Sequence, residues 1–112
     1  MNDVSLKNKI DRLRLRHQYI ALKGQVYKET NVQFEIGPGE GRQPEYLYYR
    51  NPINNSLRFR IMMGYYAGVF EYQLNHYKVL DGDRLIGKHQ QTQHFHVTQM
   101  CDKIKEIFRD ES

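Results

Sequence analysis

Apolar side chains alternate with long polar ones in the middle of the chain, and this alternation does most to constrain the fold. The apolar set is Leu57, Phe59, Ile61 and Met63, interleaved with Arg58, Arg60 and Met62. A period of two indicates a β-strand with one buried face and one solvated face. Such a strand needs neighbours in a sheet and other elements packed over its apolar side. The chain is therefore predicted to build a sheet that is covered on one side.

Further segments carry strand patterns between turn-rich stretches. They are Val32–Ile36, Tyr46–Arg50, Val69–Leu80, Arg84–Lys88 and a short final strand that contains Phe95 and Val97. Asp81-Gly82 is a strong signal for a two-residue hairpin turn that joins the strand Val69–Leu80 to the strand Arg84–Lys88. The sequence thus predicts an antiparallel meander sheet of five or six strands, over residues 25–97.

Apolar residues at helical spacing flank the predicted sheet. Residues 4–22 carry the stripe Leu6, Ile10, Leu13, His17 and Ile20, and Gly24 is expected to end this helix. A strand that begins near Leu13 is the alternative. Residues 98–110, with Thr98 as N-cap, place Met100, Cys101, Ile104, Ile107 and Phe108 on one face. The expected fold is α+β, one domain over residues 1–112, with a helix at each end of the chain packed on the sheet.

The positive charge is concentrated at the N-terminus. The chain has a net charge of +4, and residues 1–28 hold seven Lys or Arg against two Asp. On a helix, Lys9, Arg12, Arg16 and Lys23 form a ridge roughly perpendicular to the apolar stripe. This asymmetry predicts an anionic partner, either nucleic acid or an acidic protein, with Lys9, Arg12 and Arg16 as phosphate contacts. A merely solvated helix face is the alternative.

Nine tyrosines, together with Arg50, Arg58 and Arg60, suggest a stacking surface for single-stranded nucleic acid. In this interpretation, Arg58 and Arg60 contact the nucleic acid. The simpler alternative is that tyrosine is a good strand former whose ring covers a half-exposed sheet. The absence of tryptophan and of excess positive charge after residue 28 favours that alternative.

Three of the five histidines lie in one segment, at His89, His94 and His96. The expected hairpin would set His76 opposite Gly87 and make His76 and His89 diagonal neighbours. On the short final strand, His94 and His96 would point outward together while Phe95 and Val97 point into the core. His94 and His96 are then candidates for general acid–base catalysis on a phosphodiester, assisted by His89 and Lys88.

Several classes of site and location are not expected. A metal site is disfavoured because no carboxylate lies between residues 84 and 101, and no cofactor motif is present. Cys101 cannot form an internal disulfide and is expected in the core rather than as a nucleophile. With no apolar run of membrane-spanning length and no secretory signal, the expected location is the cytoplasm, without a membrane partner.

The C-terminal part of the chain resembles a known family. The segments Phe70–Tyr77, Asp81–Ile86 and His94–Val97, followed by the last helix, are similar to the TumE-type toxins of prokaryotic toxin–antitoxin pairs. The chain lacks the Asp-Asn and paired-histidine stretch that usually precedes the final histidines of that family. The resemblance implies a toxin that acts on cellular nucleic acid and is neutralised by a DNA-binding antitoxin partner.

The leading functional hypothesis is therefore a small toxin-type protein that acts on or binds nucleic acid, with RNA as the expected target. The alternative is a non-catalytic adaptor or inhibitor, of phage or immunity type, that binds a protein through the basic helix and the tyrosine-rich sheet.

Overall fold

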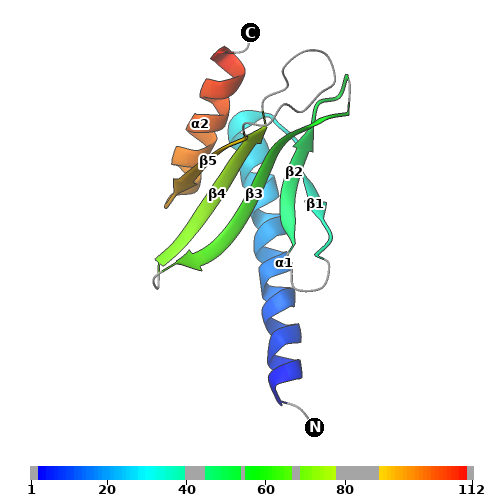
Figure 1. Cartoon of the computed structure of the whole chain (residues 1–112). Helices are drawn as coiled ribbons and strands as arrows, with labels where there is room; N and C mark the ends of the chain where they lie inside the picture. Colours follow the sequence, from blue (N-terminus) through cyan, green and yellow to red (C-terminus); the bar gives the residue numbers. More distant parts are fainter. Residues whose placement is uncertain (1–2, 40–44, 54, 67–68, 78–88, 111–112) are drawn as a thin grey trace.

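Two helices, one at each end of the chain, pack on one face of a five-stranded sheet (Figure 1). The computed structural model describes residues 3–39, 45–53, 55–66, 69–77 and 89–110. Its elements are α1 (Asp3–Thr30), β1 (Glu35–Gly37), β2 (Tyr46–Arg50), β3 (Leu57–Tyr66), β4 (Val69–Tyr77), β5 (His89–His94) and α2 (Val97–Asp110). All strand pairs are antiparallel and follow chain order, β1-β2-β3-β4-β5. The predicted meander sheet with a helix at each end is confirmed.

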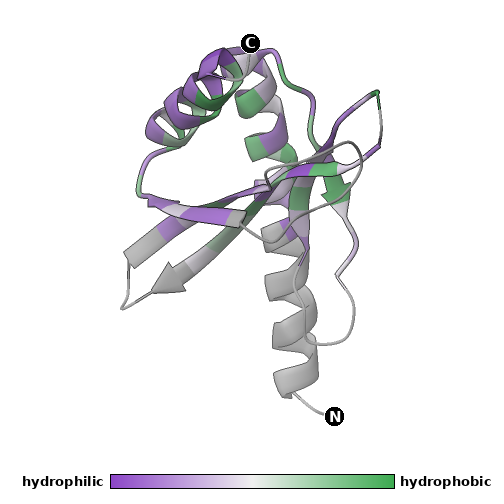
Figure 2. Cartoon of the chain, turned by 45° about the horizontal axis from the view of Figure 1, so that its top comes forward, coloured by the Kyte–Doolittle hydropathy of each residue, from purple (hydrophilic) through white to green (hydrophobic). Residues whose placement is uncertain are grey.

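The register gives the sheet two different faces. One face carries aligned apolar side chains, such as Leu47 opposite Ile61 and Ile61 opposite Leu74. Both helices pack on this side, which we call the core face, and apolar segments of the helices and the sheet turn toward their shared interior (Figure 2). The other side, which we call the helix-free face, carries the alternate residues, including Tyr48 and Arg60.

An aromatic cluster fills the centre of the core. Phe59 is fully buried, and its ring centroid lies 6.2 Å from Phe34, 6.3 Å from Tyr49 and 5.4 Å from Phe108. His76, on the neighbouring strand, stacks on Phe59 at 5.1 Å. These rings come from β2, β3, β4, α2 and the segment before β1, so the cluster joins most of the elements.

Helix α1 is longer than predicted, because Gly24 does not end it. The helix continues to Thr30, and Asn31 then takes a left-handed conformation with φ of 62°. Two hydrogen bonds mark this end: the Asn31 amide donates to the Tyr27 carbonyl, and Thr30 Oγ1 donates to the Val26 carbonyl. Val26, beyond the glycine, is fully buried. Burial of the Val26 side chain offsets the cost of about 1 kcal/mol for glycine inside a helix.

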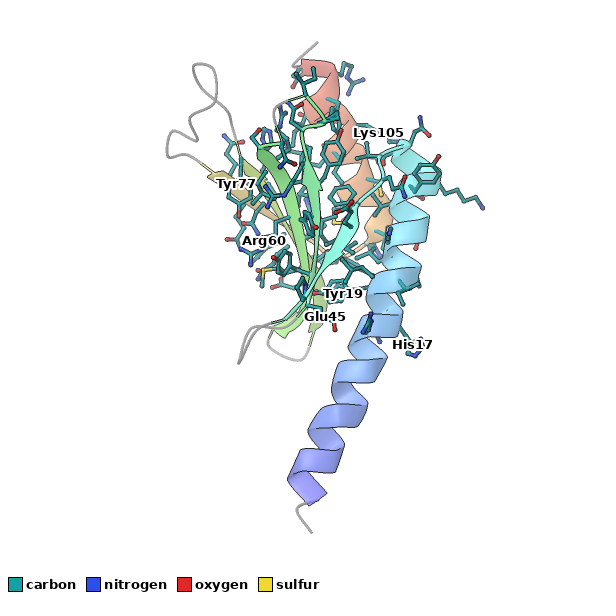
Figure 3. The ribbon with its side chains drawn as sticks, turned by 90° about the vertical axis from the view of Figure 1, so that its right-hand side faces the viewer. His17, Tyr19, Glu45, Arg60, Tyr77 and Lys105 are labelled. Atoms are coloured by element: carbon teal, nitrogen blue, oxygen red, sulfur yellow. The ribbon has the colours of Figure 1, made fainter. Side chains whose placement is uncertain are left out.

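The face of α1 that packs on the sheet is not the predicted one. Tyr19, Leu22 and Val26 enter the core, whereas His17 and Ile20 of the predicted stripe are exposed. Ile20 is 51% exposed. The first half of α1 projects past the end of the sheet (Figures 1 and 3). The sequence therefore contains two apolar stripes on this helix, and the structure buries the one that periodicity did not single out.

Tyr19 completes the sheet where β2 is too short to do so. The Met63 amide of β3 donates a hydrogen bond of 2.9 Å to Tyr19 Oη, although Met63 lies beyond the last residue of β3 that pairs with β2. Burial raises the pKa of Tyr19, so its hydroxyl stays protonated at neutral pH.

We expect Tyr19→Phe to lower the free energy of unfolding by about 1–3 kcal/mol, because the buried Met63 amide would lose its acceptor. Urea denaturation measures this change. Tyr27→Phe is the matched control on the exposed side of the same helix, and it should change the stability by less than about 0.5 kcal/mol. Equal effects of the two substitutions would mean that the Tyr19–Met63 bond contributes nothing.

The other boundaries follow the sequence with small shifts. β1 covers only Glu35–Gly37 instead of Val32–Ile36, while α2 begins at Val97, one residue before the expected start, so Thr98 is not its N-cap. The expected Asp81-Gly82 turn and Arg84–Lys88 strand lie outside the described residues.

Candidate nucleic-acid interface

The histidines of the C-terminal segment do not share one strand face. β5 ends at His94, and α2 begins at Val97, so His96 lies in the bend between them. The His96 carbonyl accepts a hydrogen bond from the Met100 amide at the start of α2. Phe95 is 58% exposed, so the expectation that it points into the core is wrong. The paired arrangement of His94 and His96 depended on a strand that reaches His96, and β5 ends two residues before it.

The predicted pairing of His76 with the histidine segment is also wrong. In the structure Tyr77 pairs with His89 and His76 pairs with Gln90, whereas the two-residue hairpin required Gly87 opposite His76. The three-residue difference in register is odd, so it exchanges the faces. His76 and His89 therefore occupy register positions that belong to opposite faces. His76 is a core residue, 5% exposed and stacked on Phe59.

His94 is half-buried at the end of β5. Its Nε2 lies 2.8 Å from Thr92 Oγ1. Burial lowers the pKa of His94, and the positive charge of Lys103 on α2 lowers that pKa further. A neutral imidazole can act as a base, but general acid–base catalysis needs a second group in reach. His96 is exposed, the side chain of His89 is not described, and Lys88 lies outside the described residues.

The lowered pKa of His94 predicts how stability depends on pH. The unfolded state binds a proton more readily than the folded state, so stability should fall as the pH drops through about 6.5. We expect the wild type to lose more stability than His94→Gln between about pH 7.5 and about pH 5. Urea denaturation at both pH values measures the difference, in which the other histidines cancel. A larger loss in the variant would contradict the assignment.

A second set of side chains forms a continuous surface on the helix-free face. The register aligns one residue from every strand in a single row: Glu35, Tyr48, Arg60, Asn75 and Gln91. A parallel row runs beside it, with Gln73 between Met62 and Gln93. In Figure 3, Arg60 and Tyr77 lie on one side of the sheet, and both helices lie on the other. The surface is aromatic and cationic over β2 and β3, and rich in amides over β4 and β5.

Two tyrosine–arginine pairs build the aromatic half of this surface. The guanidinium of Arg60 lies over the Tyr46 ring, 4.3 Å from its centroid, and that of Arg50 lies 5.6 Å from the Tyr48 centroid. The two rings are 5.9 Å apart. Together with Leu57, these four side chains line a hollow of about 200 Å³. We call this group of four residues the tyrosine–arginine cluster.

The rings of the tyrosine–arginine cluster are held from below and from the side. Tyr48 donates a hydrogen bond of 2.7 Å to Glu35, which raises the pKa of Tyr48 and keeps its hydroxyl protonated. The Tyr46 ring lies directly on Gly37, where a Cβ atom would come within 2.4 Å of a ring carbon. Only glycine leaves room for the ring in this position. The two rings are therefore preorganised.

The guanidinium of Arg60 brings positive charge to the hollow. Its Nε is buried without a hydrogen-bond partner among the described residues, and the contact that holds the group is the Tyr46 ring. Arg58 lies two residues earlier in β3, at the point where the register between β2 and β3 shifts, and it is not among the residues that line the hollow. A phosphate at the hollow would therefore meet positive charge beside two ring faces.

The predicted basic contacts fall on two separate sides of the molecule. Arg60 belongs to the helix-free face, and Arg58 lies at the register shift between β2 and β3, whereas exposed Arg16 lies on α1, which packs on the core face. Lys9 and Arg12 lie in the projecting part of α1, and their side chains are not described. The basic residues of α1 and β3 therefore do not form one continuous surface.

The amides of the helix-free face were not singled out from the sequence. Gln73, Asn75, Gln91 and Gln93 are close only because β4 and β5 pair in this register, which the expected hairpin turn would not produce. Gln73 Nε2 donates to Glu71 at 3.2 Å, which leaves the Gln73 carbonyl oxygen as an acceptor. The repeated Gln at positions 91 and 93 was the available signal, since residues two apart on a strand share a face.

Comparison with known proteins adds no relative. No family model, curated protein or solved structure matches the chain. Within the described ranges, no group of three His, Cys, Asp or Glu is arranged to hold a metal ion. Neither helix of the described chain is long and apolar enough to cross a membrane.

Proposed function

We infer that the helix-free face binds single-stranded nucleic acid, with RNA as the expected form. The observation that carries this proposal is the tyrosine–arginine cluster, in which two fixed rings and two guanidinium groups surround one hollow. Unpaired bases stack on tyrosine rings and on guanidinium planes, and arginine neutralises the phosphates that join them. The cluster supplies all of these contacts within a few residues.

The amide half of the face extends the proposal from affinity to recognition. Asparagine and glutamine side chains can donate to and accept from the edges of unpaired bases. Gln91 lies in the same row across the sheet as Arg60, beyond Asn75, which is only 7% exposed, and Gln93 lies in the neighbouring row. Gln91 and Gln93 are both exposed. A strand stacked on the tyrosine–arginine cluster would therefore continue over Gln91 and Gln93, whose amides can distinguish one base edge from another.

Binding at this face does not require the histidines. His94 lies opposite Tyr72 in a row that also contains Met63, and Met63 belongs to the core. The acid–base role of His94 and His96, with help from His89 and Lys88, stays a separate hypothesis. The toxin-type role implied by the family resemblance would follow if cellular RNA is the ligand that the helix-free face sequesters.

Titration of a labelled, single-stranded RNA of mixed sequence tests the proposal. We expect Tyr46→Ala and Tyr48→Ala each to weaken binding by roughly 5- to 150-fold, since stacking on an aromatic side chain contributes about 1–3 kcal/mol per base. Gly37→Ala should weaken binding by displacing the Tyr46 ring, although it removes no atom of the cluster. Fluorescence anisotropy at low salt measures all three.

Tyr27→Ala is the matched control, because Tyr27 is an exposed tyrosine on α1 and not on the helix-free face. It should leave RNA affinity within about twofold of the wild type. The proposal fails if the wild type binds no RNA, or if Tyr27→Ala weakens binding as strongly as the changes in the tyrosine–arginine cluster. Loss of binding in His94→Ala alone would instead favour the histidine site.

A further inference from the structure

Helix α1 has two apolar faces, and the described part of the molecule covers only one of them. Tyr19, Leu22 and Val26 pack into the core. At 100° per residue, the predicted stripe lies about 160° away on the same helix, nearly opposite the packed side. On that side Ile20 is 51% and Tyr27 is 49% exposed, and Gly24 between them has no neighbouring atom within 4 Å of an added Cβ.

The uncovered face has the spacing of a coiled-coil seam. Successive positions along this face are four and three residues apart in turn. Gly24, which has no side chain, occupies one of these positions. We call this set the α1 seam: Leu6, Ile10, Leu13, His17, Ile20 and Tyr27. Leu6, Leu13, Ile20 and Tyr27 occupy d positions of the heptad, and Ile10, His17 and Gly24 occupy a positions. The pattern continues for three heptads along a helix of 28 residues.

The residues that flank the α1 seam carry one sign of charge. The e and g positions hold six basic residues: Lys7, Lys9, Arg14, Arg16, Lys23 and Lys28. The remaining two flanking positions are Ala21 and Thr30, which are uncharged. Both acidic residues after Leu6 in this helix lie elsewhere, Asp11 at a b position and Glu29 at an f position. In coiled coils, charges at e and g select the partner.

This charge pattern disfavours a second copy of the chain. In a parallel pair, Lys9 would face Arg14 of the other copy, and Lys23 would face its Lys28. Like charges placed against each other cost several kcal/mol at an interface. Nucleic acid would satisfy the charges but would leave the apolar seam positions without partners. A partner helix with an apolar seam and acidic flanks would pair with the basic charges and also cover the apolar seam positions.

We propose that the α1 seam binds an acidic amphipathic helix of a partner protein as a short coiled coil. The projecting first half of α1 gives that helix access beyond the end of the sheet (Figures 1 and 3). The interface is on the opposite side of the molecule from the tyrosine–arginine cluster, so it does not depend on the nucleic-acid proposal.

Two designed peptides of three heptads test the charge selection on the full chain. Both have isoleucine at a and leucine at d; one has glutamate at every e and g position, and the other has lysine there. We expect the glutamate peptide to bind at least about tenfold more tightly than the lysine peptide, with the difference shrinking as salt is raised. Anisotropy of the labelled peptides measures both affinities.

Two substitutions on α1 that add the same charge test the seam itself. Ile20→Glu places a charge at a d position, whereas Gln25→Glu places it at an exposed b position. Ile20→Glu should weaken binding of the glutamate peptide at least about tenfold, and Gln25→Glu by less than about threefold. Circular dichroism confirms that both variants remain folded.

Three results would overturn the proposal. The first is equal affinity for the two peptides, or no binding of the glutamate peptide. The second is equal loss of binding in Ile20→Glu and Gln25→Glu. The third is dimerisation of the wild-type chain, seen by sedimentation velocity and abolished by Ile20→Glu, which would assign the seam to a second copy.

Discussion

Replacing Phe59 with alanine is expected to lower the free energy of unfolding by about 3–5 kcal/mol, the range for a large buried aromatic side chain. The cost should fall near the upper end, because four other rings would lose their common neighbour: Phe34, Tyr49, His76 and Phe108. These rings come from different elements, so relaxation of one cannot fill the cavity that remains. Urea denaturation at neutral pH measures the loss.

Phe95→Ala makes the same chemical change at a site that is 58% exposed. Its effect should stay within about 0.5 kcal/mol of the wild type. A comparable loss from both substitutions would show that the aromatic cluster around Phe59 is not the centre of the core.

The thiol of Cys101 is expected to react at least about tenfold more slowly in the folded protein than in urea. Burial, followed by a hydrogen bond with Glu29, raises the pKa of Cys101 from 9.0 to about 12. A pKa this high leaves very little thiolate at neutral pH, and only the thiolate attacks an aromatic disulfide reagent. The side chain is also fully buried, so the reagent cannot reach it without opening of the fold.

A variant with Gln99→Cys and Cys101→Ala provides the control for the reagent, because position 99 is exposed on the same helix. Its thiol should react rapidly under native conditions. If Cys101 in the wild type reacts as quickly as this exposed thiol, α2 does not hold Cys101 in the core, and the interpretation of Cys101 as a core residue is wrong.

Local alternation was enough to predict the strands, since the burial of one strand face depends mainly on neighbouring residues. Phe59, Ile61 and Met63 do face the core, and Arg60 between them belongs to the helix-free face. Leu57 departs from the alternation: it lines the hollow beside Arg60, because the register between β2 and β3 shifts at Arg50. The face of α1 could not be predicted in this way. Two apolar stripes share that helix, and only the position of the sheet decides that Tyr19, Leu22 and Val26 are the buried set.

The site was harder to predict than the fold, because it depends on register between strands. The tyrosines and arginines of β2 and β3 were identified as a group, but the contact of Arg60 with Tyr46 needs the two strands in their observed alignment. The pairing of His76 with His89 failed for the same reason, whereas the arrangement of His94 and His96 failed because β5 ends at His94. Among the described residues, pairing of β4 with β5 begins at Tyr77 and His89, and eleven residues separate these two positions. A turn signal inside that interval does not determine the register.

The two halves of α1 have unequal thermodynamic support. Starting a helix is the costly step of helix formation, whereas each further turn adds little cost. The half that contains Tyr19, Leu22 and Val26 is fixed by its burial against the sheet. This packed half of α1 therefore supplies the helix nucleus, and the projecting turns extend from it toward Asp3. A partner helix would meet turns that are already wound, and association would not have to supply the entropy of winding them.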